Sequence, residues 1–228
     1  MQTQHRRQSI ALTGAATLLA LVWSTSVPAE AAPQDDVDYD NDDDNDDDDE
    51  EEAERFDDGF NLYISPGGLN QPLTGRDEID YLDNFDPGYQ WGLGFGYFFR
   101  SDSRFALQAG PFFEHAIINA DGRDLGDPGG EHLFRAGLEV EPGVVLGERL
   151  FLGLPLRGGY AGDLLRVGDE VDVSHGGHFG VGLGMDLALW KGFYIGSAIG
   201  TDLHFFRAGA PNYDAYALTW RTRVGYRF

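Results

Sequence analysis

Histidines next to carboxylates or a serine are the residues of this chain that could carry catalysis. They occur as Glu114-His115, as Asp202 close to His204, and in the run Asp172-Val173-Ser174-His175. A hydrolase needs a nucleophile, a base and an orienting acid within hydrogen-bond distance of one another. Adjacent side chains on an extended chain point to opposite sides, so none of these runs predicts a triad by itself. We therefore predict no catalytic residue and keep a hydrolase as an alternative.

His175 and His178 are close enough in sequence to share a metal ion. Zinc sites use three or four protein ligands, and no third ligand type accompanies this pair, so loop or interior histidines are the favoured interpretation. The chain has no cysteine, which excludes thiolate metal sites and a disulfide framework. We predict neither a metal site nor a cofactor.

A larger set of charged residues lies on the polar faces of stretches in which polar and apolar residues alternate. If these faces meet in an interior, carboxylates and arginines can pair, which matters because burying an unpaired charge is costly. The acidic and basic members are nearly balanced in number, which favours a closed, hydrogen-bonded interior. The predicted network consists of Glu114, Arg135, Glu139, Glu141, Arg157, Asp186, Asp202, Arg221 and Arg223.

Eight alternating stretches would position these side chains. A period of two residues is that of a β-strand, with one apolar face and one small or polar face. On the second face, glycines leave room for longer neighbours, and they are Gly92, Gly94, Gly96, Gly180, Gly182, Gly184, Gly196 and Gly200. The stretches cover about residues 59–67, 88–100, 104–118, 132–146, 150–157, 178–189, 193–205 and 216–228.

The final stretch is the longest uninterrupted alternation. Leu218, Trp220 and Val224 share an apolar face with other aromatic residues, whereas Arg221 and Arg223 lie on the opposite face. Strands of soluble sandwiches usually run about five or six residues. A strand that crosses a membrane needs about 9 to 11 residues, so this stretch is long enough to span one.

Short and long links between the stretches alternate. The links at residues 100–104, 147–149 and 190–192 are short, whereas those at about 68–88, 119–131, 162–177 and 207–214 are long and rich in glycine, aspartate and proline. Short turns on one rim and long loops on the other are typical of outer-membrane barrels, whose short turns are periplasmic. The sequence therefore predicts an all-β, eight-stranded, antiparallel up-and-down transmembrane barrel over residues 57–228.

Aromatic residues near the strand ends predict two interfacial girdles. Phe98, Phe99, Phe105, Phe151, Trp190 and Phe193 would form one, and Tyr89, Phe205, Tyr213 and Tyr216 the other. A soluble, lipocalin-like cup would instead turn its apolar residues inward. The small, glycine-rich second face favours the membrane barrel.

Prolines at positions 111, 142 and 155 conflict with a continuous ladder, because proline lacks the donor N–H. We expect bulges to absorb them and at least one strand to bend there.

The N-terminus predicts export. Basic His5-Arg6-Arg7 precedes an apolar run over residues 10–23 and small-residue sites, the layout of a secretory signal peptide. We predict a signal peptide over residues 1–31, with cleavage after Ala29 or Ala31. No later stretch has the eighteen consecutive apolar residues of a candidate membrane helix.

An acidic low-complexity segment follows. Residues 35–54 hold fifteen acidic residues and no basic one, which predicts a disordered segment over residues 32–56. A solvated periplasmic spacer is the favoured interpretation, and divalent-cation binding by its carboxylates is the alternative. From Arg55 onward there are 23 acidic and 14 basic residues, which argues against nucleic-acid binding.

The exported, alternating chain with its aromatic end resembles the small outer-membrane β-barrel families of OmpA and OmpX type. The resemblance covers about residues 57–228 and is architectural. It implies that Phe228, with Tyr226 and Val224 two and four positions earlier, is the signal read by the outer-membrane assembly machinery. We expect no peptidoglycan-binding domain of the OmpA type.

Three functions follow from these patterns. The leading one is a structural or surface-interaction barrel in the cell outer membrane. Its long loops would face outside, with lipid and lipopolysaccharide around it and an unidentified loop ligand. The alternatives are a lipid-A-modifying barrel enzyme, which some small barrels are, and a small-solute channel.

Overall fold

The computed structural model describes residues 56–75, 85–101, 104–119, 129–167, 169–209 and 212–228. The predicted signal peptide and the acidic segment up to residue 55 lie outside these residues. Within the described part of the chain, no helix is long and apolar enough to cross a membrane.

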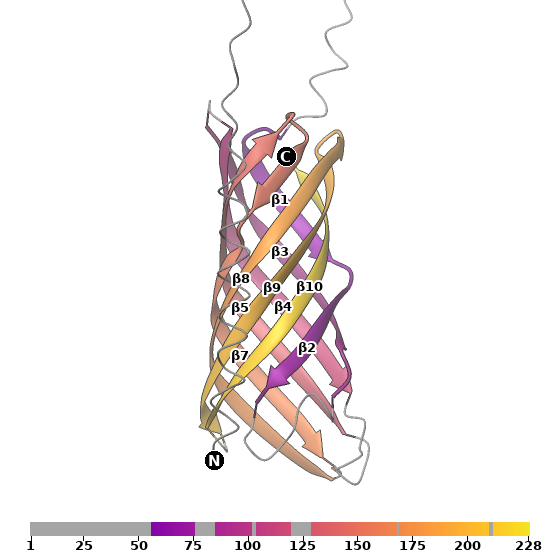
Figure 1. Ribbon diagram of the computed structural model, residues 1–228, viewed down its shortest axis with the longest axis vertical. Coiled ribbons are helices and arrows are strands. Elements are labelled where there is room, and N and C mark those ends of the chain that lie inside the picture. Colours follow the sequence, from indigo (N-terminus) through magenta and orange to yellow (C-terminus); the bar gives the residue numbers. More distant parts are fainter. Residues whose placement is uncertain (1–55, 76–84, 102–103, 120–128, 168, 210–211) are drawn as a thin grey trace, which may run out of the picture. The chain divides into compact units, whose positions relative to one another are not determined.

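The described residues form ten strands. Every pairing between them is antiparallel, and β1 and β2 each pair with both β3 and β10, which closes the sheet into a barrel (Figure 1). The strands are β1 (Gly59–Ser65), β2 (Gly68–Thr74), β3 (Gly88–Arg100), β4 (Phe105–Asn119), β5 (Gly130–Leu146), β6 (Leu150–Gly153), β7 (Leu156–Val167), β8 (Glu170–Trp190), β9 (Phe193–Gly209) and β10 (Tyr213–Arg227).

Two breaks account for ten strands where eight were predicted. β1 and β2 lie end to end between β3 and β10, and β6 and β7 lie end to end between β5 and β8. Each couple forms one ribbon of the barrel wall. The prediction of an eight-stranded, antiparallel up-and-down barrel is therefore confirmed, with two of the eight predicted strands each divided in two.

The first ribbon continues beyond its predicted end at residue 67. Ile64 lies opposite Val224 and Leu69 opposite Trp220, so β1 and β2 together contain one residue more than β10 over this stretch. The extra residue at Pro66 and Gly67 reverses which alternate side chains face inward. The prediction of a loop from residue 68 was wrong, because this reversal ends the alternation without ending the strand.

Neighbouring strands satisfy the backbone at this break. The Tyr89 hydroxyl donates to the Pro66 carbonyl oxygen, and the Thr222 backbone N–H donates to the Gly67 carbonyl oxygen at 3.0 Å. The Thr222 hydroxyl donates to the same Gly67 oxygen. A break in a strand is tolerated when the polar groups that it frees have such partners.

The other strand prolines behave differently from one another. Pro155 lies in the break between β6 and β7, where the Leu154 N–H donates to the Pro142 carbonyl oxygen at 2.9 Å. Pro111 and Pro142 lie inside continuous strands, opposite Leu138 and Leu107. The prediction of bulges at these prolines was wrong, because the register is unchanged past each of them; Pro155 instead interrupts its strand.

Three short turns define one rim of the barrel, called the short-turn rim below. They span residues 101–104, 147–149 and 191–192, as predicted. Gly147 and Glu148 have φ of 55° and 66°, and Lys191 and Gly192 have φ of 46° and 81°. Two successive residues in this left-handed region are typical of tight hairpin turns whose twist matches the strands.

The opposite rim differs from its prediction at two links. β7 extends to Val167 and β8 begins at Glu170, so the predicted loop at 162–177 is a hairpin; β9 and β10 likewise leave only residues 210–212 between them. Gly176, within the predicted loop, instead allows close strand approach, because a Cβ atom there would lie 1.8 Å from the Phe205 carbonyl oxygen. Residues 75–87 and 120–129 remain as long links.

Side-chain exposure decides which face is outside. Leu93, Leu218 and Trp220 are 46%, 42% and 44% exposed, whereas the alternate Arg221 and Arg223 are 3% and 2% exposed. The apolar faces therefore point outward and the polar faces point into the lumen. This arrangement excludes the lipocalin-like cup.

The predicted girdles need correction at Phe98, Phe151 and Tyr213. Phe98 and Phe151 are completely buried, and Tyr213 is 8% exposed, because all three lie on the inward face of their strands. Position near a turn was the wrong criterion, since alternation decides the direction of each side chain. Exposed aromatic residues near the two rims include Tyr89, Phe99, Phe105, Trp190, Phe193 and Tyr216.

Candidate functional site

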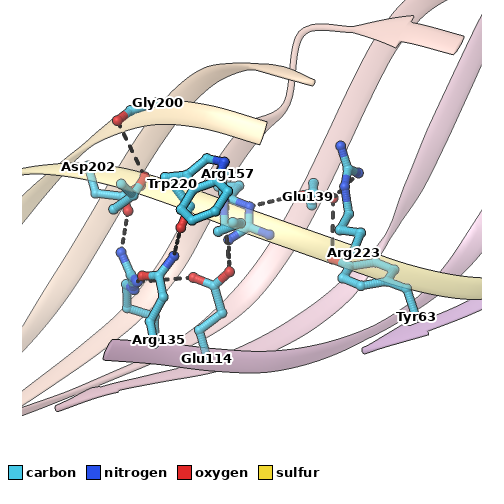
Figure 2. A network of polar contacts seen from close by, with 12 residues as sticks. Tyr63, Glu114, Arg135, Glu139, Arg157, Gly200, Asp202, Trp220 and Arg223 are labelled. Atoms are coloured by element: carbon cyan, nitrogen blue, oxygen red, sulfur yellow. Dashed lines mark hydrogen bonds and ion pairs between the residues drawn. The ribbon is translucent and has the colours of Figure 1, made fainter. Parts of the chain in front are cut away.

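The lumen is the candidate functional site. All nine residues of the predicted network point into it, and each is at most 4% exposed. They come from six strands around the barrel, with Glu114 on β4, three residues on β5, and the others on β7, β8, β9 and β10. Figure 2 shows the centre of this network.

Glu114 is the hub of the network. Its Oε1 atom lies 2.5 Å from Arg157 Nη1 and 3.5 Å from Arg221 Nη1, and its Oε2 atom lies 3.1 Å from Arg135 Nη2. Glu114 and Arg135 are register partners on β4 and β5, so the ladder itself brings them together. One buried carboxylate thus faces three guanidinium groups.

Arg135 extends the network away from the short-turn rim. Its Nη1 atom pairs with Asp202, and its Nη2 atom donates to Gln90 Oε1 at 2.7 Å. The amide nitrogen of Gln90 in turn donates to the Trp220 carbonyl oxygen at 3.1 Å. The charged cluster is thereby tied to the backbone of the last strand (Figure 2).

Arg223 ends the network towards the short-turn rim. Its Nη1 and Nη2 atoms bind Glu141 at 2.6 and 3.1 Å, and its Nε atom lies 3.3 Å from Asp186 Oδ1. Glu139 joins this group to the hub, because it pairs with Arg157 and lies 3.8 Å from Arg223. The Tyr63 hydroxyl also donates to Glu139, at 3.3 Å.

Glycines on other strands leave the space that the carboxylates occupy. A Cβ atom on Gly184 would lie 2.2 Å from Glu141 Oε1, and one on Gly180 would lie 2.1 Å from Asp202 Oδ1. No real side chain approaches so closely. The narrow lumen of an eight-stranded barrel is thus filled by long charged residues set against glycine.

The predicted network omitted the residues without a formal charge that also point into the lumen. Tyr63 and Gln90 bond to it directly, and His178 and His204 are buried register partners with ring centroids 6.2 Å apart. Alternation alone predicts all four on inward faces. They were missed because only formally charged residues were counted.

Comparison with known proteins identifies the fold. No family model and no curated protein sequence matches the chain. Neisserial surface protein A, a solved structure, matches with a TM-score of 0.52 and 11% identity, covering 75% of this chain and 97% of that one. The chain has the fold of a small outer-membrane β-barrel.

Two further solved barrels are similar at lower scores. OprG from Pseudomonas aeruginosa is 12% identical with a TM-score of 0.46, covering 76% of this chain and 97% of that one. Ail, the attachment invasion locus protein of Yersinia pestis, is 14% identical with a TM-score of 0.46, covering 76% of this chain and 100% of that one. The fold assignment rests on the first comparison and on the strand topology.

The barrel separates the residues considered for catalysis or metal binding. Ser174 is buried in the lumen, whereas Asp172 and His175 are exposed, and His175 Nδ1 lies 2.5 Å from the Tyr160 hydroxyl. His175 and His178 lie on opposite faces of the wall, so they do not form the metal-binding pair considered above. Within the described ranges, no cluster of three histidine or acidic residues could hold a metal.

The other two histidine–carboxylate pairs are not arranged for catalysis either: one pair lies on opposite faces of the wall, and the carboxylate of the other is bound by an arginine. Glu114 points into the lumen, whereas His115 points outward, and its Nε2 atom lies 3.1 Å from His132 Nδ1. The His115 ring stacks on Phe134 with centroids 4.4 Å apart. Asp202 and His204 do share the lumen, but Asp202 is bound by Arg135.

The three residues of the predicted assembly signal lie on the outer face of β10 and at its end. Val224 is 40% exposed and Phe228 is 72% exposed, and the Tyr226 ring packs edge-on against Phe193 and Phe228 at 4.8 and 4.9 Å. The Phe228 N–H donates to the Phe60 carbonyl oxygen at 2.8 Å, which holds the C-terminus at the seam with β1.

Proposed function

We propose that this protein resides in the cell outer membrane as a structural or surface-interaction barrel whose lumen is closed to solutes. The observation that carries the proposal is the inverted distribution of side chains, with apolar residues outside and paired charges inside. Large exposed apolar surface has no place on a soluble monomer but suits a wall that contacts lipid. Lipid and lipopolysaccharide are therefore its immediate partners.

The lumen supports a closed barrel over a channel. Five carboxylates and four arginines form a connected set of ion pairs across the barrel axis. A permeating solute would have to separate them, at the cost of leaving buried charges unpaired. A lipid-A-modifying activity is not favoured, because Ser174 faces the lumen whereas His175 faces outward.

External partners would bind at the rim opposite the short turns. The long links at residues 75–87 and 120–129 and the end of the β7–β8 hairpin lie there, and they would face outside if the short turns are periplasmic. The acidic segment would then be periplasmic, where its carboxylates are suited to divalent cations. The assembly machinery would read Val224, Tyr226 and Phe228.

Two measurements test this proposal. We expect the protein to fractionate with outer membranes and to migrate faster on a gel before heating than after, which reports a folded barrel. In planar lipid bilayers, we expect no discrete conductance steps. A soluble protein without heat-dependent migration would contradict the location, and steady conductance would contradict the closed lumen.

A further inference from the structure

An aromatic socket lies in the lumen at the short-turn rim, beyond the last ion pairs. It consists of Phe98 on β3, Phe151 on β6, Tyr194 on β9 and the guanidinium of Arg227 on β10. The Phe98 and Phe151 rings meet edge to face at 5.2 Å, and the guanidinium carbon of Arg227 lies 3.8 Å from the Phe98 ring centroid. None of these residues belongs to the ion-pair network.

The ring of Phe56 fills this socket. Its centroid lies 5.6 Å from that of Phe98 and 6.3 Å from those of Phe151 and Tyr194, and only 1% of Phe56 is exposed. The Arg227 guanidinium carbon lies 4.5 Å from the Phe56 ring centroid. Such cation–π contacts strengthen when they are desolvated, so Phe56 and Phe98 together offset the burial of this arginine.

The backbone of Phe56 is tied across the rim. Its N–H donates to the Glu148 carbonyl oxygen at 3.0 Å, in the turn that follows β5. Its carbonyl oxygen accepts from Arg100 Nη1 at 3.2 Å, at the end of β3. The Asp58 carboxylate accepts from the Arg100 backbone N–H. The residues before β1 are therefore held by the two turn regions as a strap.

We infer that Phe56 is a stopper, and that the aromatic socket is its binding site at the short-turn mouth of the lumen. The inference rests on the closed lumen proposed above and adds a second seal, which is apolar and separate from the ion pairs. Its occupant is the residue at which the acidic segment joins the barrel. The strap holds Phe56 at the rim, and the Phe56 side chain excludes water from the lumen.

Asn61 offers a probe of the lumen beside Arg227, whose guanidinium contacts the Phe56 ring. It is completely buried opposite Arg227, and neither side-chain amide atom has a hydrogen-bond partner among the described residues. Because the chain contains no cysteine, Asn61→Cys introduces a single thiol. Phe60 supplies a matched control, since it lies one residue away in sequence but points outward and is 55% exposed.

The experiment compares thiol labelling by a membrane-impermeant methanethiosulfonate reagent in three folded proteins: N61C, F56A/N61C and F60A/N61C. Folding is checked for each by heat-dependent migration. We expect labelling of F56A/N61C to be at least about tenfold faster than that of the other two proteins. Without the buried ring and its cation–π contact, the mouth of the lumen is no longer closed to the reagent. F56L/N61C, which keeps apolar volume, replaces the alanine variant if that one does not fold.

The outcomes separate the two proposals. If folded N61C labels slowly and the two double variants, F56A/N61C and F60A/N61C, label at the same rate as each other, the stopper is overturned and the closed lumen stands. If folded N61C itself labels as fast as the denatured protein, the closed lumen fails.

Discussion

Replacing Glu114 by alanine is expected to lower the free energy of unfolding by about 3–5 kcal/mol, because it leaves buried arginines without their shared partner. Arg135, Arg157 and Arg221 all lie within 3.5 Å of this carboxylate. The measurement is a urea titration of the protein folded in detergent micelles, followed by tryptophan fluorescence and by the fraction that shows heat-dependent migration.

An exposed ion pair provides the control for the Glu114 variant. Asp214 lies 2.5 Å from Arg207, and both side chains are about half exposed, at 47% and 55%. Asp214→Ala should cost no more than about 1 kcal/mol, because water screens the pair. Equal losses for the two variants would contradict the account of the lumen network, since they would mean that burial adds nothing to the role of Glu114.

Leu93→Arg is expected to cost about 2–4 kcal/mol in lipid vesicles, the penalty for arginine on the lipid face of a barrel near the bilayer midplane. Leu93 lies near the middle of β3 and points outward, with 46% of its surface exposed. In a soluble protein, an arginine at such an exposed position would be tolerated. The measurement is the same urea titration carried out in vesicles.

Val171→Arg is the matched control for the depth of the substituted residue in the bilayer. Val171 is 52% exposed near the start of β8, on the rim opposite the short turns and beyond Ser174, where the pairing of β8 with β9 ends. This substitution should cost about 0–1 kcal/mol, as expected near or outside the membrane interface. If both arginine variants were equally harmless, the outer face of the barrel would not be in contact with lipid.

Alternation was sufficient to predict the wall of the barrel. The period of two along residues 88–100 and 216–228 identifies which side chains share a face, and the contrast between leucine or tryptophan on one face and glycine or arginine on the other identifies the lumen. Each strand of the wall is buried on one side only, so the residues that face the lumen can be identified from the sequence of that strand alone. The fold and the membership of the ion-pair network are therefore predictable from sequence.

Interactions between distant strands were not predictable in the same way. The stretch at 162–177 was interpreted as a loop, although Gly176 lets neighbouring backbones approach, which depends on partners elsewhere in the chain. The reversal at Pro66 depends on the ladder to β10. In each case the deciding contact is remote in sequence.

The pairing within the site also depends on barrel geometry. Sequence alone groups Glu114 with four arginines, but only the register of six strands makes it the partner of three of them. The position of Phe56 shows the same limit. It follows an acidic run that predicts disorder, and only the assembled socket shows why its ring is buried.

Lipid contact at Trp220 tests the central claim most directly. Trp220 lies midway along β10 on the outer face, 44% exposed, and its Nε1 atom donates to Ser197 Oγ at 2.7 Å, so its polar group is satisfied without water. A variant with Trp91→Phe and Trp190→Phe, prepared without the signal peptide predicted over residues 1–31, would keep Trp220 as its one tryptophan and would be folded into vesicles. We predict strong quenching of its fluorescence by lipids brominated on their acyl chains and little quenching by aqueous acrylamide. Strong quenching by acrylamide with none by brominated lipid would contradict a barrel whose apolar face meets the membrane.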